Sequence, residues 1–297
     1  MMRTALLLAW LAVVSTVRGD ASLSAEIRID EPVFLPGEDL PAGLRLVNLS
    51  GRPVKYAATP DWVTFFVERH GGSAVIQRAE LEPTDEFTLE SATAGTREWN
   101  LASAFDLTTP GTYSISAQVR VPDAGVTLFA PPQTVLVSPG MTLSETTFGR
   151  PAPEGGHEVR KYTLIQANRK RDLRLYVSVA DEAGLRPWKV TSLERLLSFS
   201  RPEHQLDRES NLHIILQSGA REFSYFTVNP DGELIGRQRH MLIPGSRPRL
   251  AAGTNGLVTV AGGARVPLPT GLPPAPPPAL AEASLEPPPA SGAAPAP

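Results

Sequence analysis

The chain has 297 residues, a formal net charge of −3 and no cysteine. Without cysteine it forms no disulfide and offers no thiolate nucleophile, so its fold must depend on the burial of apolar side chains. A net charge this close to zero gives no indication of a nucleic-acid partner.

The first 19 residues are typical of a secretory signal peptide. Arg3 precedes an apolar stretch at residues 5–14, and small residues follow before Asp20. This stretch is shorter than the roughly 20 apolar residues that a membrane-spanning helix needs. The absence of cysteine excludes a lipid-anchored bacterial lipoprotein, and it fits bacterial export better than a eukaryotic secretory pathway. We therefore expect an exported protein, in the periplasm or outside the cell.

The balance of charge changes sign along the chain. Residues 20–139 contain 16 acidic and 8 basic side chains, whereas residues 140–266 contain 13 acidic and 18 basic ones. This change predicts a first domain at 20–139, a linker at 140–156 and a second domain at 157–266, with drift in composition as the alternative explanation. Residues 267–297 hold 12 prolines and only two charged side chains, which predicts a disordered, extended tail.

Short strands separated by Gly and Pro fill the first domain. We expect them at residues 25–29, 44–48, 62–68, 87–89, 97–101, 112–121 and 134–137, with turns at 50–53 and 71–72. Such regular spacing predicts an all-β, antiparallel sandwich.

A sharper local pattern surrounds Tyr113. Asp106 and Pro110-Gly111-Thr112 precede this tyrosine, as in the corner before a late strand of immunoglobulin-like folds. In that corner the tyrosine hydroxyl bonds to the backbone a few residues upstream. Antibody domains have a cysteine two residues later, where this chain has Ile115, so apolar packing is expected to replace the disulfide.

Residues 43–137 resemble the domain of bacterial intracellular proteinase inhibitors of the subtilisin-inhibiting type. The likeness rests on the pattern from Leu44 to Val54, on the segment WVTFFVERHGG at 62–72, and on Trp99 followed by the Pro110 to Tyr113 run. It implies an immunoglobulin-like fold and, as one possible activity, protease inhibition. The inhibitory loops would then be the connections at 74–86 and 123–132.

The second domain also consists of predicted strands. Residues 159–166 and 172–180 form a hairpin around the polar turn 167–171, and residues 212–217, 223–229 and 233–241 form a meander, with a last strand at 257–260. Asp207, Asn211, His213, Tyr225 and the Asp231-Gly232 turn resemble one blade of a β-propeller. About 110 residues are too few for a closed propeller. We expect a small blade-like sandwich or meander that covers its edge on the first domain or on another chain.

One short helix is predicted near residues 191–197. Thr191 and Glu194 have the spacing of a capping box, and Val190, Leu193, Leu196 and Leu197 recur at three- and four-residue intervals.

No constellation of residues points to catalysis, a cofactor or a metal. The five histidines lack metal-binding spacing, and no nucleophile elbow, phosphate loop or dinucleotide fingerprint occurs. His213 lies within a strand, so it is either on the solvent face or a hydrogen-bonded polar group of the core.

The densest basic cluster is Arg169, Lys170, Arg171 and Arg174, which is the candidate partner-binding site. It could bind an anionic surface, and a solvated hairpin turn is the alternative. Taken together, the sequence predicts an exported, non-enzymatic binding or structural protein of the bacterial envelope. It would contact a protein or polysaccharide through β edges and loops. The alternatives are an exported proteinase inhibitor and a carbohydrate-active enzyme, and the oligomeric state stays open.

Overall fold

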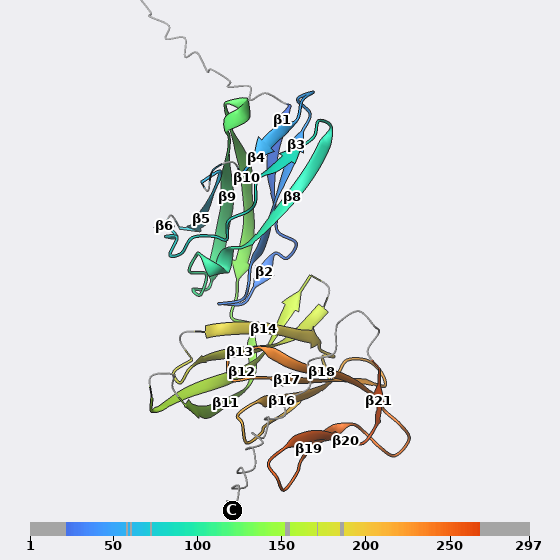
Figure 1. The fold of residues 1–297 in the computed structure, drawn as a ribbon. Coiled ribbons are helices and arrows are strands. Elements are labelled where there is room, and N and C mark those ends of the chain that lie inside the picture. Colours follow the sequence, from blue (N-terminus) through green and yellow to red (C-terminus); the bar gives the residue numbers. More distant parts are fainter. Residues whose placement is uncertain are drawn as a thin grey trace, which may run out of the picture.

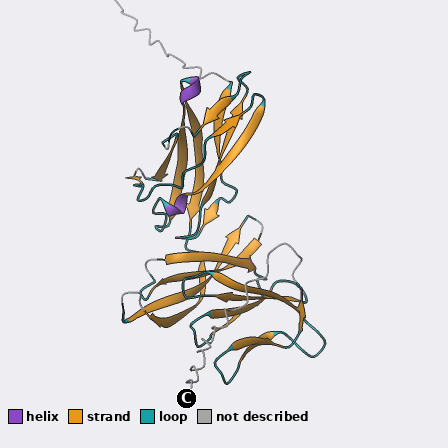
Figure 2. Ribbon diagram, in the orientation of Figure 1, coloured by secondary structure: helices purple, strands orange, loops and turns teal. Residues whose placement is uncertain are grey.

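The computed structural model describes residues 22–57, 59, 61–71, 73–151, 155–170, 172–184 and 187–267. The predicted signal peptide at 1–19 and the predicted tail beyond Pro267 lie outside these residues. Within them the chain is all-β and forms several antiparallel sheets, which confirms the predicted fold class (Figures 1 and 2). Hydrophobic side chains gather in two large clusters, one formed by residues 23–137 and the other by residues 148–228.

Two sheets enclose the first cluster, and we call this unit the first sandwich. One sheet has the order β1 (Leu23–Arg28), β3 (Pro41–Asn48) and β8 (Thr93–Asn100). The other has the order β2 (Val33–Phe34), β10 (Val126–Val137), β9 (Gly111–Val121), β5 (Val63–Arg69) and β6 (Ser73–Ala74). The remaining elements are the pair β4 (Val54–Tyr56) and β7 (Phe87–Leu89) and two short 3-10 helices, η1 (Leu101–Ser103) and η2 (Pro122–Ala124).

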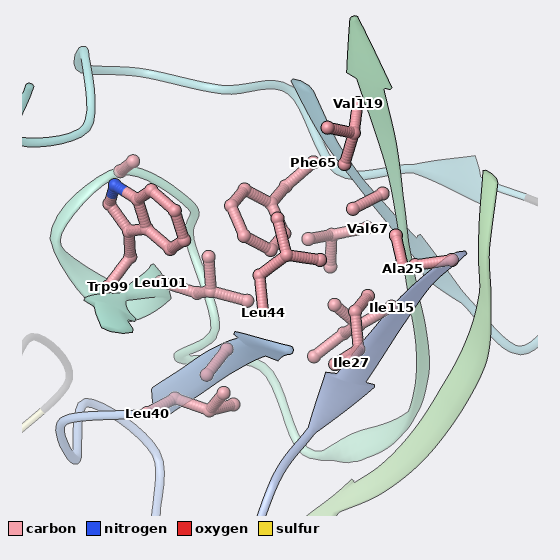
Figure 3. Packing of buried hydrophobic residues seen from close by; sticks show 14 of the residues in the cluster. Ala25, Ile27, Leu40, Leu44, Phe65, Val67, Trp99, Leu101, Ile115 and Val119 are labelled. Carbon is pink, nitrogen blue, oxygen red and sulfur yellow. The ribbon is translucent and has the colours of Figure 1, made fainter. Parts of the chain in front are cut away.

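Alternating burial along the strands explains how the first sandwich holds together without disulfides. Every second side chain of β1 points inward, and the odd-numbered residues of β9 do the same. Ile27 and Ile115 meet Leu44 and Phe65 in the centre, and Trp99 closes one end (Figure 3). Each such side chain contributes roughly 1.5–3 kcal/mol when it is fully buried.

The corner predicted around Tyr113 is present. The Tyr113 hydroxyl donates to the Thr109 carbonyl oxygen at 2.6 Å. Asp106 fixes the same loop, because its carboxylate accepts hydrogen bonds from both the backbone N–H and the hydroxyl of Thr108. The Thr108 hydroxyl bond lowers the pKa of that carboxyl. Ile115 is buried in the core, as expected for apolar packing at this position.

Two further sheets form the second sandwich. One has the order β11 (Met141–Pro151), β12 (His157–Arg169), β13 (Asp172–Asp181) and β14 (Pro187–Arg195). The other has the order β15 (Glu203–Leu206), β16 (Leu212–Gln217), β17 (Glu222–Val228), β18 (Leu234–Met241) and β21 (Ala264–Val266). A hairpin of β19 (Arg249–Ala252) and β20 (Val258–Ala261) completes it.

The predicted hairpin is β12–β13 and the predicted meander is β16–β17–β18. The segment 140–156, which we expected to be a linker, differs. Residues 141–151 are the edge strand β11, so only residues 138–140 connect the last strand of the first sandwich to the second.

The helix predicted near residues 191–197 is wrong, because residues 187–195 form strand β14. Val190 and Leu193 are both buried but belong to different clusters, since they lie on opposite faces of the sheet. A β-bulge at Leu193 adds to the irregular spacing, because Leu175 pairs with Glu194 and Tyr176 with Ser192. Strand β14 therefore buries an apolar side chain on each face, and the spacing of these side chains resembles that of one helical face.

Candidate functional site: the groove between the two sandwiches

The two sandwiches meet over a small apolar patch. Leu35, from the loop after β2, packs on Ile165, Ala167, Tyr176 and Val190, which lie on β12, β13 and β14. Figure 1 shows β2 at the end of the first sandwich that faces β14. Gly140 lies in the same contact: a Cβ there would be 2.7 Å from Ile165 and 2.9 Å from Leu35. Only glycine fits at this position, because any side chain would prevent the close approach of Leu35 to Ile165.

A buried ion pair lies beside this patch. The Arg169 guanidinium binds both carboxylate oxygens of Glu38 and donates to the Tyr176 hydroxyl. Glu38 also accepts the Leu35 N–H at 2.8 Å. The Arg169 and Glu38 side chains are only 6% and 12% exposed. Burial raises the pKa of the Glu38 carboxyl, and the Leu35 N–H and the Arg169 guanidinium act against that rise.

Backbone contacts extend the junction along the edge of the second sandwich. Glu38 forms an isolated parallel bridge with Val190 of β14. Next to it, the Lys189 ammonium lies 3.3 Å from the Asp39 carboxylate, where both side chains are about half exposed. The first sandwich thus contacts the edge strand β14. The sequence had left open whether the first domain or another chain would cover an edge of the second domain.

A groove of about 400 Å³ opens at this junction, with walls from both sandwiches. The first sandwich contributes Gly37, Asp39, Arg78, Asn100 and residues 102–108, and the second contributes residues 187–189. The polar groups of the first wall are held in place. The Asn100 amide donates to Asp39 at 2.8 Å and accepts the Leu40 N–H, and Arg78 pairs with Asp106 at 2.6 Å.

The second wall presents an aromatic ring. Trp188 is 45% exposed, and the Arg160 guanidinium lies 4.0 Å from its ring centre. Arg160 is fixed in turn by Asp231 and Glu158, each at 2.9 Å. The groove therefore combines carboxylates, amide and hydroxyl groups and cations with one ordered, exposed aromatic surface.

The predicted partner-binding cluster divides in the structure. Arg169 turns into the junction and binds Glu38, Lys170 is exposed, and Arg174 is half-buried on β13. Arg171 lies outside the described residues. Whether the exposed members bind a partner stays a prediction.

Sequence reasoning missed Glu38, Asp39 and Trp188. The signal for the first two was the Pro36-Gly37 turn directly before a carboxylate pair, but nothing local identifies their partners about 130–150 residues away.

Of the residues likened to a propeller blade, Asp207, Asn211, His213 and Tyr225 form a second polar cluster, whereas Asp231 pairs with Arg160. The Asp207 carboxylate lies 3.0 Å from His213 Nε2 and accepts bonds from the N–H groups of Glu209 and Asn211. His213 Nδ1 lies 2.6 Å from the Tyr225 hydroxyl. His213 is thus the hydrogen-bonded, buried polar group that was one of its two predicted environments.

Comparison of the chain with models of protein families, with curated proteins and with solved structures found no match. Among the described residues, no His, Cys, Asp and Glu side chains are grouped so that they could hold a metal ion. The part of the chain that the structure describes contains no helix long and apolar enough to span a membrane.

Proposed function

We propose that the protein is an exported, non-enzymatic binding protein of the bacterial envelope that holds a polysaccharide in the groove between its two sandwiches. The observation that carries this proposal is a polar groove built from both sandwiches and fixed by the buried Arg169–Glu38 pair. We further propose an immunoglobulin-like fold for the first sandwich, supported by the Tyr113 corner, and a blade-like origin for the second.

The chemistry of the groove suits a sugar chain. Sugar hydroxyls both donate and accept hydrogen bonds, and the groove offers acceptors at Asp39 and Asp106 and donors at Arg78 and Lys189. The apolar face of a sugar ring can pack on an exposed indole such as Trp188. The groove is partly open to solvent, so a sugar chain can reach its polar groups without being fully enclosed.

Binding of the mature chain to a panel of immobilised neutral and acidic polysaccharides tests the proposal. Trp188→Ala should weaken the binding by about tenfold, the value of roughly 1.4 kcal/mol for one lost aromatic contact. Phe129→Ala is the matched control. Phe129 is 72% exposed and lies near the start of β10, whose other end leads to the junction. No retained polysaccharide, or equal loss in both variants, would reject the proposal.

Protease inhibition is a second candidate, because one observation favours it. The loop that follows β6 carries Ile76, which is 80% exposed, and it is anchored at several points. The indole N–H of Trp99 donates to the Glu82 carbonyl, and that of Trp62 donates to the Thr84 hydroxyl, each at 3.1 Å. An inhibitory loop needs such rigidity.

The other predicted inhibitory loop, 123–132, is largely strand, since β10 begins at Val126. Titration of a subtilisin-like protease with the mature chain decides between the two candidates. If the Ile76 loop inhibits, protease activity falls stoichiometrically and Ile76→Asp abolishes the effect. Full protease activity at excess protein leaves only the polysaccharide proposal.

A further inference from the structure

A second pocket lies on the second sandwich, on the outer face of the sheet β15-β16-β17-β18-β21. It shares no lining residue with the groove. The hairpin β19–β20 covers part of this face and packs Leu250 and Val260 against Ile215, Phe223 and Tyr225. The Glu203 carboxylate accepts the Leu250 N–H at 3.1 Å and ties the hairpin to β15. Beside this contact a pocket of about 480 Å³ remains open, which is within the range of small-molecule sites.

Strand register places the polar lining of this pocket. Tyr225 pairs with Gln238, and His240 pairs with Arg265, so these four side chains occupy one face of β17, β18 and β21. Thr259 and the Gly262-Gly263 turn form the opposite wall. The floor therefore presents a phenol, an amide, an imidazole and a guanidinium to the same space.

The Tyr225 hydroxyl is fixed by hydrogen bonds to two neighbouring side chains. The Asp207 carboxylate only accepts hydrogen bonds, so Nε2 of His213 carries a proton, and Nδ1 of the same ring shares a hydrogen bond with the Tyr225 hydroxyl. The Thr227 hydroxyl donates to the same phenol oxygen at 3.2 Å. Burial raises the pKa of Tyr225, so the phenol stays neutral and no negative charge arises there.

Among the described residues, four arginines on or near the pocket have no carboxylate partner. Arg265 forms no ion pair with any described residue, and the same holds for three arginines on nearby segments, namely Arg221, Arg247 and Arg249. The Arg247 guanidinium lies over the ring of Phe223, and Phe223 is the cross-strand partner of His240. By contrast, Arg237 and Arg239, which alternate with His240 on β18, pair with Glu194 on the inner side.

We propose that this pocket binds a small anionic ligand, whose carboxylate or phosphate group is held by Arg265 with His240 and Gln238 beside it. A guanidinium binds such oxyanions in a bidentate manner, and Tyr225 and Thr259 supply a neutral polar surface for the rest of the ligand. The guanidiniums on neighbouring segments that have no ion-pair partner among the described residues raise the local concentration of anions. This site shares no residue with the groove, so the test of anion binding here is independent of the test of polysaccharide binding there.

Titration of the full mature chain, followed by NMR and thermal shift, tests the inference with three probes. Inorganic phosphate and glucuronate carry the two oxyanion types, and glucose is the neutral match of glucuronate. We expect saturable binding of at least one anion, weakened by added salt. Phosphate alone would assign a phosphorylated ligand, and glucuronate alone an acidic sugar.

Arg265→Gln should weaken anion binding by about tenfold or more, as expected for the loss of a charge-assisted hydrogen-bond pair. Arg52→Gln removes an exposed arginine from the first sandwich and should change nothing. Both substitutions are at exposed positions, so folding is retained. The inference is overturned if neither anion saturates, if glucose binds as well as glucuronate, or if the two variants bind alike.

Discussion

Replacement of Glu38 by Gln should detach the two sandwiches from one another. The substitution leaves the Arg169 guanidinium 6% exposed beside a neutral amide, while its Nη1 atom already has no hydrogen-bond partner. Removal of one partner from a buried ion pair costs about 3–5 kcal/mol, because the remaining charge is neither solvated nor compensated. We expect Glu38→Gln to lower the free energy of unfolding by about 3 kcal/mol.

Asp39→Asn is the matched control for this change. It alters the neighbouring residue in the same loop and weakens its ion pair with Lys189. The side chains of Lys189 and Asp39 are 42% and 57% exposed. An exposed pair of this kind contributes within about 0.5 kcal/mol. Replacement of both Glu38 and Arg169 by Met should recover most of the lost stability, because no buried charge then remains.

Urea unfolding of the mature chain, with cleavage at residues 138–140 by a protease as a second readout, measures these differences. Glu38→Gln should expose the connection to cleavage well before either sandwich unfolds, since each has its own core. Equal losses in Glu38→Gln and Asp39→Asn would refute the idea that burial of the charge pair controls the junction.

Three further outcomes follow from the structure. Gly140→Ala should destabilise the protein by about 1 kcal/mol or more beyond Gly125→Ala in thermal unfolding, because both glycines have positive φ but only Gly140 lacks room for a Cβ. Tyr113→Phe should cost about 1 kcal/mol, measured by urea unfolding, because it loses the bond to a backbone carbonyl. Burial lowers the pKa of His204 and His240, so the unfolded state binds protons first and stability should fall as the pH drops below about 6.5. A flat melting temperature between pH 7.5 and pH 5 would contradict that pH dependence.

Elements with local signals were predictable from the sequence. The alternation in β1 and β9, the Tyr113 corner and the polar turn of the β12–β13 hairpin each depend on residues within about ten positions of one another. The failure at residues 191–197 has the same origin, because a local period cannot distinguish a helix from a bulged strand that is buried on both faces.

The candidate site was not predictable in this way, because its parts come from distant segments. Arg169 was selected as a surface cation from its neighbours Lys170 and Arg171, but its environment is set by Glu38, 131 residues away. Trp188 and Arg78 reach the same groove only after both sandwiches have formed and docked. Charge density along a sequence therefore identifies residues that need partners, and the tertiary structure decides where those partners are.

The junction is better suited to fixing a geometry than to adding stability. Its apolar patch, formed by Leu35 on Ile165, Ala167, Tyr176 and Val190, is small and would tolerate rotation of one sandwich on the other. Burial of Arg169 is costly, and a pair of apolar side chains there would hold the units as tightly. The Arg169 guanidinium, however, is held on β13 through the bond from Nε to the Tyr176 hydroxyl, and its Nη2 binds Glu38, so the pair restricts how one sandwich is oriented on the other. The width of the groove depends on that orientation, so a ligand that spans both walls requires the ion pair even where stability does not.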